Sequence, residues 1–309
     1  MTKQFGDFDY KEEYQFEIIP CPYEQTTTYG KGTAGGPAAV IEASQELEFY
    51  DDEFNLDPSD YGIRTIAPVE MELQHARHER PFVELEDVCK AAYERKKFPL
   101  VIGGEHSLSL GAVRAAYEAA EGNLTLLHFD AHADLRQEYN GNPYNHACAI
   151  YSIYKACPRI KIVSVGIRNI SREECDWLRG LEKQVEEHVL EEMPISIFYA
   201  RDEFHKTYGF REAAKNFKED IGAKQTSKQF SPGSRFKYWN SKDVIDTIRN
   251  YGNHKLYISF DLDGLDSTLM PSTGTPEPGG LDWYTSTNII REACKESELI
   301  GADVVELAP

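Results

Sequence analysis

Seven short runs of mostly apolar residues recur along the chain, and this feature most constrains the fold. A strand that is covered on both faces needs no polar alternation, so each run is typical of a buried strand. Segments with helical spacing lie between them, which favours βα units and a mostly parallel sheet. The predicted strands are 16–20, 98–104, 124–130, 160–168, 195–200, 255–261 and 299–307, and the predicted helices are 84–97, 107–120 with Ser107 as N-cap, and 242–250.

Composition sets the size and the setting of the protein. The 309 residues, 41% of them hydrophobic, can bury one large α/β core. A net charge of −19 argues against nucleic acid or an anionic membrane as partner. The six cysteines form no CxxC pair, the polar start resembles no leader peptide, and no apolar run approaches the ~18–20 residues that span a bilayer. We therefore expect a cytoplasmic protein.

One polar segment interrupts the regular alternation. Residues from about 203 to 241 are rich in lysine and poor in apolar side chains, with Ser-Pro-Gly-Ser in the middle. This composition predicts a solvated surface insertion rather than a domain. A lid over a binding site and a contact between subunits are the alternatives.

Three of the predicted strand ends carry acids or imidazoles. Ligands of parallel sheets bind beyond the carboxyl ends of the strands, so these groups should face one site. Taken singly, each has an ordinary explanation: a histidine after a Gly-Gly turn is often a cap, and Asp-x-Asp is often turn chemistry. The three groups are His106 after Gly103-Gly104, the alternating set Asp130, His132 and Asp134, and the pair Asp261 and Asp263.

Together these groups favour a metal centre. Crowded carboxylates repel one another unless a cation joins them. Four carboxylates and two imidazoles are too many for one divalent ion that also holds water, but they suit two. Oxygen ligands mixed with imidazole favour Mn(II) over the thiolate sites typical of zinc. Two ions about 3.5–4 Å apart can make a shared water nucleophilic at neutral pH.

Five ordered blocks of this sequence resemble the ureohydrolase family, which includes arginase and agmatinase. They are "GGEHSLSLG", "FDAHADLR", "NPYNHACA", "SFDLDGLDSTLMPSTGTPEPGGL" and "GADVVELAP". The resemblance runs from about Pro20 to the last residue, apart from the insertion, and "HADLR" and "STGTPEPGG" look more like agmatinase. It implies one domain over 1–309 with three αβα layers and a homo-oligomer, trimer or hexamer. Family members usually continue past "VVELAP", so the C-terminus looks short.

The resemblance also implies roles for individual residues. Two Mn(II) ions per chain would be held by His106, Asp130, His132, Asp134, Asp261 and Asp263, with Asp130 and Asp263 split between the ions or bridging them. Asp134 would also position the nucleophile. His146 matches the histidine that transfers protons, and Glu306 matches the acid that receives the guanidinium; both would contact substrate. On the residues alone, His146 would be a surface histidine and Glu306 an exposed acid. The remaining histidines have no matching role and are expected to be structural or solvated: His75, His78, His128, His188, His205 and His254.

The expected reaction is hydrolysis of a small guanidino compound to urea and an amine. Agmatine is the first choice because Arg136 stands where arginase has an asparagine that holds arginine's carboxylate and amine. Guanidinobutyrate, guanidine and arginine are the alternatives, and nickel could replace manganese. Two other classes stay open: a catalytically silent relative, and a deacetylase-like amidohydrolase with a single zinc. The paired-acid motifs favour two ions.

Overall fold

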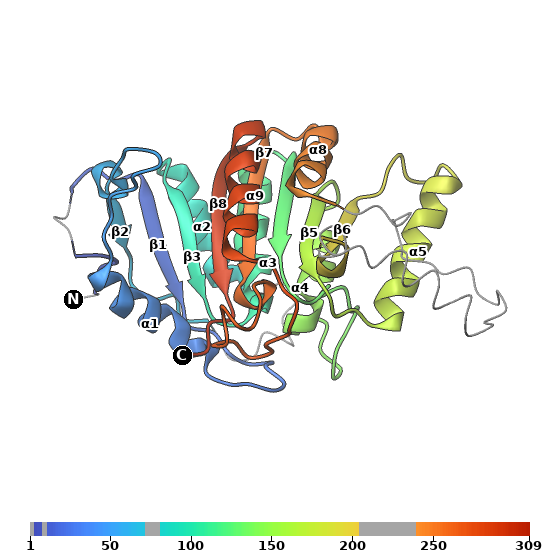
Figure 1. The fold of residues 1–309 in the computed structure, drawn as a ribbon, viewed down its shortest axis with the longest axis horizontal. Helices are drawn as coiled ribbons and strands as arrows, with labels where there is room; N and C mark the ends of the chain where they lie inside the picture. The colour runs from blue at the N-terminus through green and yellow to red at the C-terminus, as the bar shows by residue number, and fades with distance from the viewer. Residues whose placement is uncertain (1–2, 8–10, 72–80, 204–238) are drawn as a thin grey trace.

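All eight strands form one parallel sheet in a computed structural model that describes residues 3–7, 11–71, 81–203 and 239–309 (Figure 1). The strand order is β2-β1-β3-β8-β7-β4-β5-β6, and every neighbouring pair runs parallel. The strands are β1 (Phe16–Cys21), β2 (Ile63–Thr65), β3 (Phe98–Gly103), β4 (Leu124–Phe129), β5 (Lys161–Ile167), β6 (Ile195–Tyr199), β7 (Lys255–Asp261) and β8 (Glu298–Val305).

Helices cover both faces of this sheet (Figure 1). The α-helices in the described residues are α1 (Gly36–Ala43), α2 (Val83–Glu94), α3 (Ser109–Ala119), α4 (Ala149–Ala156), α5 (Arg172–Glu186), α8 (Ser241–Tyr251) and α9 (Trp283–Glu296). The 3-10 turns η5 (His106–Leu108), η6 (His146–Cys148) and η7 (Leu262–Gly264) follow strands or loops at one edge of the sheet.

Two hydrophobic cores lie on opposite faces of the sheet, because side chains alternate along each strand. On β4, Leu126 packs in the core that contains residues of α2, α3 and α4, whereas Leu127 and Phe129 pack in the core that contains residues of α8 and α9. All of these strand side chains are fully buried. The predicted three-layer αβα fold with a mostly parallel sheet is therefore confirmed.

The predicted elements agree with the structure to within one or two residues for the seven strands, and all three predicted helices exist. The N-cap prediction for Ser107 is wrong. Residues His106–Leu108 already form a 3-10 turn before α3, and the Ser107 hydroxyl donates to Glu105 at 2.6 Å. The predicted insertion lies outside the described residues between 204 and 238.

Strand β2 and four helices were not predicted. Strand β2 has only three residues, and α1 and α4 have eight each, which is too short for a clear period. None of the helices that the structure describes has the length and apolar composition needed to cross a membrane. The six cysteines are all free thiols.

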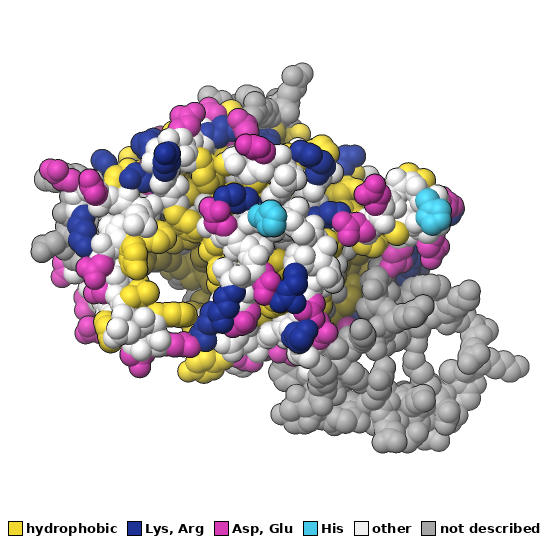
Figure 2. All heavy atoms as spheres, turned by 90° about the horizontal axis from the view of Figure 1, so that it is seen from above, with side chains coloured by type: hydrophobic (Ala, Val, Ile, Leu, Met, Phe, Trp, Pro, Cys, Tyr) yellow, Lys and Arg dark blue, Asp and Glu magenta, His cyan; other side chains and the backbone are white. Residues whose placement is uncertain are grey.

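The two ends of the sheet differ. The carboxyl ends of the strands lie at the lower edge in Figure 1, where long loops and the C-terminal segment gather. Figure 2 views the opposite end of the sheet, where basic and acidic side chains are intermixed with apolar ones. The sequence motifs of interest all fall at the carboxyl edge, which directs attention there.

Candidate metal centre

Four neighbouring strands deliver the predicted site residues to one place. The sheet order β3-β8-β7-β4 places the segment after β3, with His106, beside the end of β8, with Glu306. Strand β7 ends at Asp261, and Asp130 follows directly after β4. The chain folds so that residues up to 200 positions apart, such as His106 and Glu306, touch.

A glycine turn brings His106 into the site. A Cβ on Gly104 would lie 1.9 Å from the carbonyl oxygen of Tyr23, so only glycine fits there. The same carbonyl accepts a hydrogen bond from the backbone N–H of Glu105 at 2.9 Å. The next residue, His106, is thereby placed at the start of η5 with its ring buried.

The ring of His106 faces three carboxylates. Its Nδ1 lies 3.1 Å from Asp130 Oδ2, 3.3 Å from Asp261 Oδ2 and 3.4 Å from Asp134 Oδ2. This buried nitrogen has no hydrogen bond of acceptable geometry. One nitrogen and three carboxylate oxygens, all possible metal ligands, thus converge on one point.

The contact of the other ring nitrogen, Nε2, explains why Nδ1 of His106 faces the carboxylates. The hydroxyl of Ser259 donates to Asp303 at 2.7 Å, so its oxygen accepts from His106 Nε2–H at 2.9 Å. In its neutral form the ring then carries its proton on Nε2, which leaves the lone pair of Nδ1 free for a cation held among the carboxylates. This is the arrangement by which outer hydrogen bonds prepare a histidine to bind a metal ion.

A second group of ligand atoms lies beside the first. His132 Nδ1 is 3.0 Å from Asp263 Oδ2 and 3.4 Å from Asp130 Oδ1. Asp130 therefore faces His106 with one oxygen and His132 with the other. Asp263 faces His132 with Oδ2, while its Oδ1 accepts the backbone N–H of Ala131 at 3.0 Å. The donor set fits two cations with Asp130 between them.

Electrostatic strain in the cluster supports this fit. Burial raises the pKa of Asp261 well above its usual range, and repulsion by Asp263 and Asp130 adds to the rise. Burial, with the charge of Asp130, likewise raises the pKa of Asp134 to about 7. Burial alone would lower the pKa of His106, but its contacts with the three carboxylates raise it well above the usual range. A pair of dications would relieve this repulsion.

Two of the predicted site residues have left-handed backbones. Asp134 has φ 50° and Glu306 has φ 66°, a region that costs non-glycine residues about 1–2 kcal/mol. Glu306 is held there because its N–H donates to the Gly104 carbonyl at 2.8 Å and its side chain accepts the His106 N–H at 2.8 Å. Such strain is common where a side chain must point into a site.

A cavity of about 230 Å³ opens over the cluster. Its walls include Glu306 and His146, which the sequence predicted to contact substrate, and Arg136. Burial raises the pKa of Glu306 well above its usual range, and it lowers the pKa of His146. The lining residues are Thr28, His106, His132, Asp134, Arg136, Tyr139, His146, Ala147, Asn169, Asp261, Asp263, Thr275 and Glu306.

The sequence does not indicate that several other residues contact the predicted ligands. His128, expected to be structural or solvated, is fully buried and contacts Asp130 Oδ2 through Nε2 at 2.9 Å. The hydroxyl of Thr275 donates to Asp263 at 3.0 Å. Thr26 and Glu105 support His146: the Thr26 hydroxyl accepts the backbone N–H of His146 at 3.0 Å and donates to Glu105 at 2.7 Å. Only the position of His128, two residues before Asp130 on the same strand face, could have suggested a shared role.

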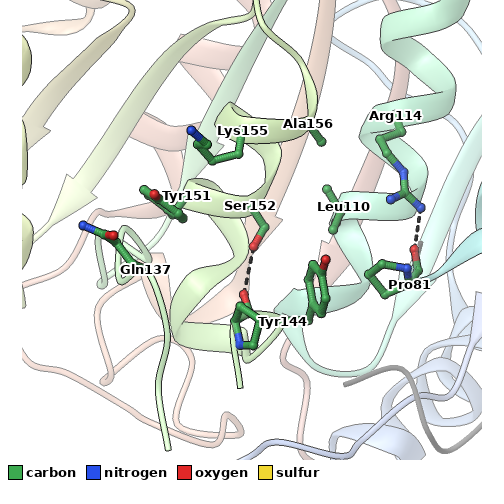
Figure 3. A pocket seen from close by; sticks show the side chains of 10 residues that line it. Pro81, Leu110, Arg114, Gln137, Tyr144, Tyr151, Ser152, Lys155 and Ala156 are labelled. Atoms are coloured by element: carbon green, nitrogen blue, oxygen red, sulfur yellow. Dashed lines mark hydrogen bonds between the residues drawn. The ribbon is translucent and has the colours of Figure 1, made fainter. Parts of the chain in front are cut away.

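A second cavity, of about 320 Å³, lies beside α3 and α4 (Figure 3). Its lining includes Arg114, whose guanidinium donates to the Pro81 carbonyl, and Ser152, whose hydroxyl donates to the Pro143 carbonyl at 3.0 Å. None of its lining residues is a carboxylate or a histidine. It thus lacks the carboxylates and imidazoles that converge in the first cavity, so the cluster around His106 and Asp130 is the candidate functional site.

Comparisons with known proteins agree with this geometry. The model of the Arginase family matches residues 14–207 and 193–309. The chain is 33% identical to the N(1)-aminopropylagmatine ureohydrolase of Synechocystis over 94% of this chain and 81% of that protein, and 24% identical to the agmatinase of Pyrococcus horikoshii over 96% and 85%. The crystal structure of the agmatine ureohydrolase of Thermoplasma volcanium superposes with a TM-score of 0.71 at 26% identity, covering 96% of this chain and 83% of that one.

Proposed function

Because this chain belongs to the arginase family, we propose that it is a ureohydrolase that uses two divalent cations to convert a guanidino compound into urea and an amine. The observation that carries the proposal is the convergence of four carboxylates and two imidazoles beneath a cavity that also contains Glu306. The expected metal is manganese, since hard oxygen ligands mixed with imidazole suit Mn(II).

The contacts within the cluster support one division of the ligands between two cations. One would be held by His106, Asp134 and Asp261, and the other by His132 and Asp263, with Asp130 supplying one oxygen to each. When bound, such a pair lowers the pKa of a shared water and stabilises developing negative charge.

Protein side chains would bind and orient the substrate. Glu306 presents a buried carboxyl group to the cavity, and a carboxylate can hold the planar N–H fork of a guanidinium. The His106 N–H fixes Oε1 of that carboxyl group, so the side chain is already oriented before substrate binds. The reaction adds one water to the guanidinium carbon and breaks the bond from that carbon to the alkyl-substituted nitrogen. His146 is placed to pass a proton to the leaving amine.

We propose a substrate whose far end is an amine, namely N(1)-aminopropylagmatine or agmatine itself. The names of the relatives at 30–33% identity support the first, and the names of relatives at 24–25% support the second. Hydrolysis of agmatine yields putrescine, and hydrolysis of its aminopropyl derivative yields spermidine. The guanidinium of Arg136 stacks on the ring of Tyr139 at 4.9 Å, so its charge is engaged by the loop, as expected if the tail is cationic.

Arg136 also supports a second candidate, a guanidino acid such as guanidinobutyrate. The side chain lines the cavity, and a small rotation away from Tyr139 would offer its fork to a carboxylate. A cytoplasmic location stays a prediction from the composition, and assembly into trimers or hexamers stays a prediction from the family resemblance.

A substrate panel tests the proposal. The full chain is loaded with Mn(II), or with Ni(II) in parallel, and urea release is measured with N(1)-aminopropylagmatine, agmatine, guanidinobutyrate, guanidine and arginine. We expect the two amine-tailed compounds to have the highest kcat/KM. Loaded protein that releases no urea from any of the five would refute the proposal and favour a catalytically silent relative.

A further inference from the structure

A hydrogen-bond network behind His146 determines which of its ring nitrogens carries the proton. Its centre is Glu105, a fully buried carboxylate just before the ligand His106. Glu105 Oε2 accepts the backbone N–H groups of Gln25 and Thr26 at 2.7 and 2.6 Å. Its Oε1 accepts the hydroxyls of Thr26 and Ser107 at 2.7 and 2.6 Å. Three of these four donors, the two N–H groups and the Thr26 hydroxyl, attach the loop that carries Thr26 to the turn that contains His106.

Thr26 joins this network to His146 by two contacts of its hydroxyl, and its backbone also accepts a hydrogen bond from the His146 side chain. Its hydroxyl oxygen accepts the backbone N–H of His146 at 3.0 Å, and it lies 3.1 Å from Nδ1 of the same ring. A hydroxyl has one proton and two lone pairs. The proton goes to Glu105, because a hydrogen bond to a charged carboxylate is stronger than one to a neutral imidazole.

In the contact between the Thr26 hydroxyl and Nδ1 of His146, only one of the two atoms can then be the donor. Since the Thr26 hydroxyl has given its proton to Glu105, Nδ1 of His146 must be the donor in the 3.1 Å contact. We infer that Thr26, held by Glu105, is a positioning residue that keeps His146 in the Nδ1–H form with the lone pair of Nε2 turned to the cavity. This inference rests on the proposed function for its catalytic meaning, but the proton position can be tested without it.

The fixed form suits a residue that exchanges protons with substrate. The ring of His146 contacts the Thr26 hydroxyl through Nδ1 and lines the cavity, so Nε2 is the nitrogen left for the substrate. Nε2 can therefore take a proton from an attacking group and return it to the leaving amine. With the opposite proton position, Nε2–H could not act as a base, and the ring would also lose its fixed orientation.

The backbone at His146 does not depend on Thr26 alone, so variants at Thr26 should fold. The side chain of Asn145 caps the turn η6 by accepting the Ala147 N–H at 3.0 Å. The neighbouring Thr27 supplies a matched control, because its hydroxyl donates to Glu24 at 3.2 Å and not to Glu105.

The first experiment locates the proton directly. The full chain with ¹⁵N-labelled histidine is studied by NMR, metal-free and loaded with diamagnetic Mg(II), and the signals of His146 are assigned by their loss in His146→Asn. We expect wild type and Thr27→Val to have a protonated Nδ1 and an unprotonated Nε2. Thr26→Val should give a mixture of forms. A protonated Nε2 in wild type, or an unchanged ring in Thr26→Val, would overturn the inference.

A variant at Glu105 should reverse the proton position. In Glu105→Gln the amide oxygen can still accept the two backbone N–H groups, which leaves the amide NH₂ facing Thr26. The Thr26 hydroxyl would then accept from the amide and donate to His146 Nδ1, so the proton moves to Nε2. An Nδ1–H form in a folded Glu105→Gln protein would contradict the proposed polarity.

Kinetics of the Mn(II)-loaded protein provide a separate readout. General acid–base catalysis contributes about 10²–10⁴-fold, so Thr26→Val should lower kcat roughly 10- to 100-fold with little change in KM. Thr26→Ser, which keeps the hydroxyl, should recover most of the rate. Equal kcat for Thr26→Val and wild type would refute the positioning role, whereas inactivity of wild type on every guanidino compound would refute the proposed function and leave the NMR result standing.

Discussion

The carboxylate of Glu306 accepts the backbone N–H of His106 at 2.8 Å, which ties the proposed guanidinium-binding group to the turn that carries a proposed metal ligand. The two residues are 200 positions apart in the sequence and adjacent in the sheet order. A guanidinium bound at Glu306 would therefore be held at a fixed height above the cluster of carboxylates and imidazoles. Positioning of this kind contributes to catalysis without any chemical step by the residue.

Glu306→Gln should separate this binding role from the structural one. The amide oxygen can keep the hydrogen bond from His106, so the fold and the thermal midpoint should change little. The charge that holds the guanidinium is lost, and kcat/KM should fall about 10²–10³-fold. Urea assays and thermal melts check both, with Glu138→Gln, an exposed acid on the loop after Arg136, as control. A large loss of stability instead would make Glu306 a structural residue.

The number of metal ions bound per chain in ligand variants should distinguish residues that bind one ion from a residue that binds both. Asp130 faces His106 with one oxygen and His132 with the other, so Asp130→Ala should abolish turnover and lower the bound metal below one ion per chain. His132→Ala removes a contact of the second group only, and it should retain about one ion. Elemental analysis after dialysis measures both. Two ions per chain in Asp130→Ala would disprove its assignment.

The sequence predicts those site residues that directly follow the end of a strand. Apolar runs that end abruptly at Asp130 and Asp261 predicted both the strands and the edge at which their acids meet, because parallel strands share a carboxyl edge. The three-residue strand β2 has no such run and was missed. Contacts across the fold were also beyond sequence reasoning: nothing in the local pattern indicates that Thr26 meets His146, 120 positions away.

Stability of the metal-free protein should depend on pH through Asp134. Its pKa in the fold is about 7, whereas an aspartate in an unfolded chain has a pKa of about 3.9. Between these values the folded state binds more protons, so the free energy of unfolding should decrease as pH rises from about 4 to 7. The loss arises because a charged Asp134 is buried beside the carboxylate of Asp130. Chemical denaturation of the chelator-treated protein at several pH values measures this slope.

Added metal and one variant provide the controls for that slope. Manganese should stabilise the protein most near pH 7–8, where the carboxylates are free of protons and bind it best. Asp134→Asn, which cannot ionise, should make this slope shallower, while Asp261 and Glu306, whose pKa values are also raised, supply the remainder. Metal-free wild type that becomes more stable from pH 5 to 7 would show that the carboxylate cluster is not the source of strain.

Close packing of two glycines should make the loops above Glu306 intolerant of a methyl group. Gly30 donates its N–H to the Gly274 carbonyl at 2.9 Å, and a Cβ on Gly30 would lie 2.6 Å from that same oxygen. Backbone atoms must then move, which destabilises by about 1–3 kcal/mol. The adjacent Thr275 would shift from Asp263, so Gly30→Ala should also lower kcat about tenfold.

Gly180→Ala is the matched control, because nothing lies within 4 Å of a Cβ built on Gly180 in the exposed part of α5 (Arg172–Glu186). Removing a helical glycine should raise the free energy of unfolding by about 0.5–1 kcal/mol and leave kcat unchanged. Denaturation and urea assays of the two variants side by side test the contrast, and equal behaviour of the two would mean that the Gly30–Gly274 contact does not hold these loops in place.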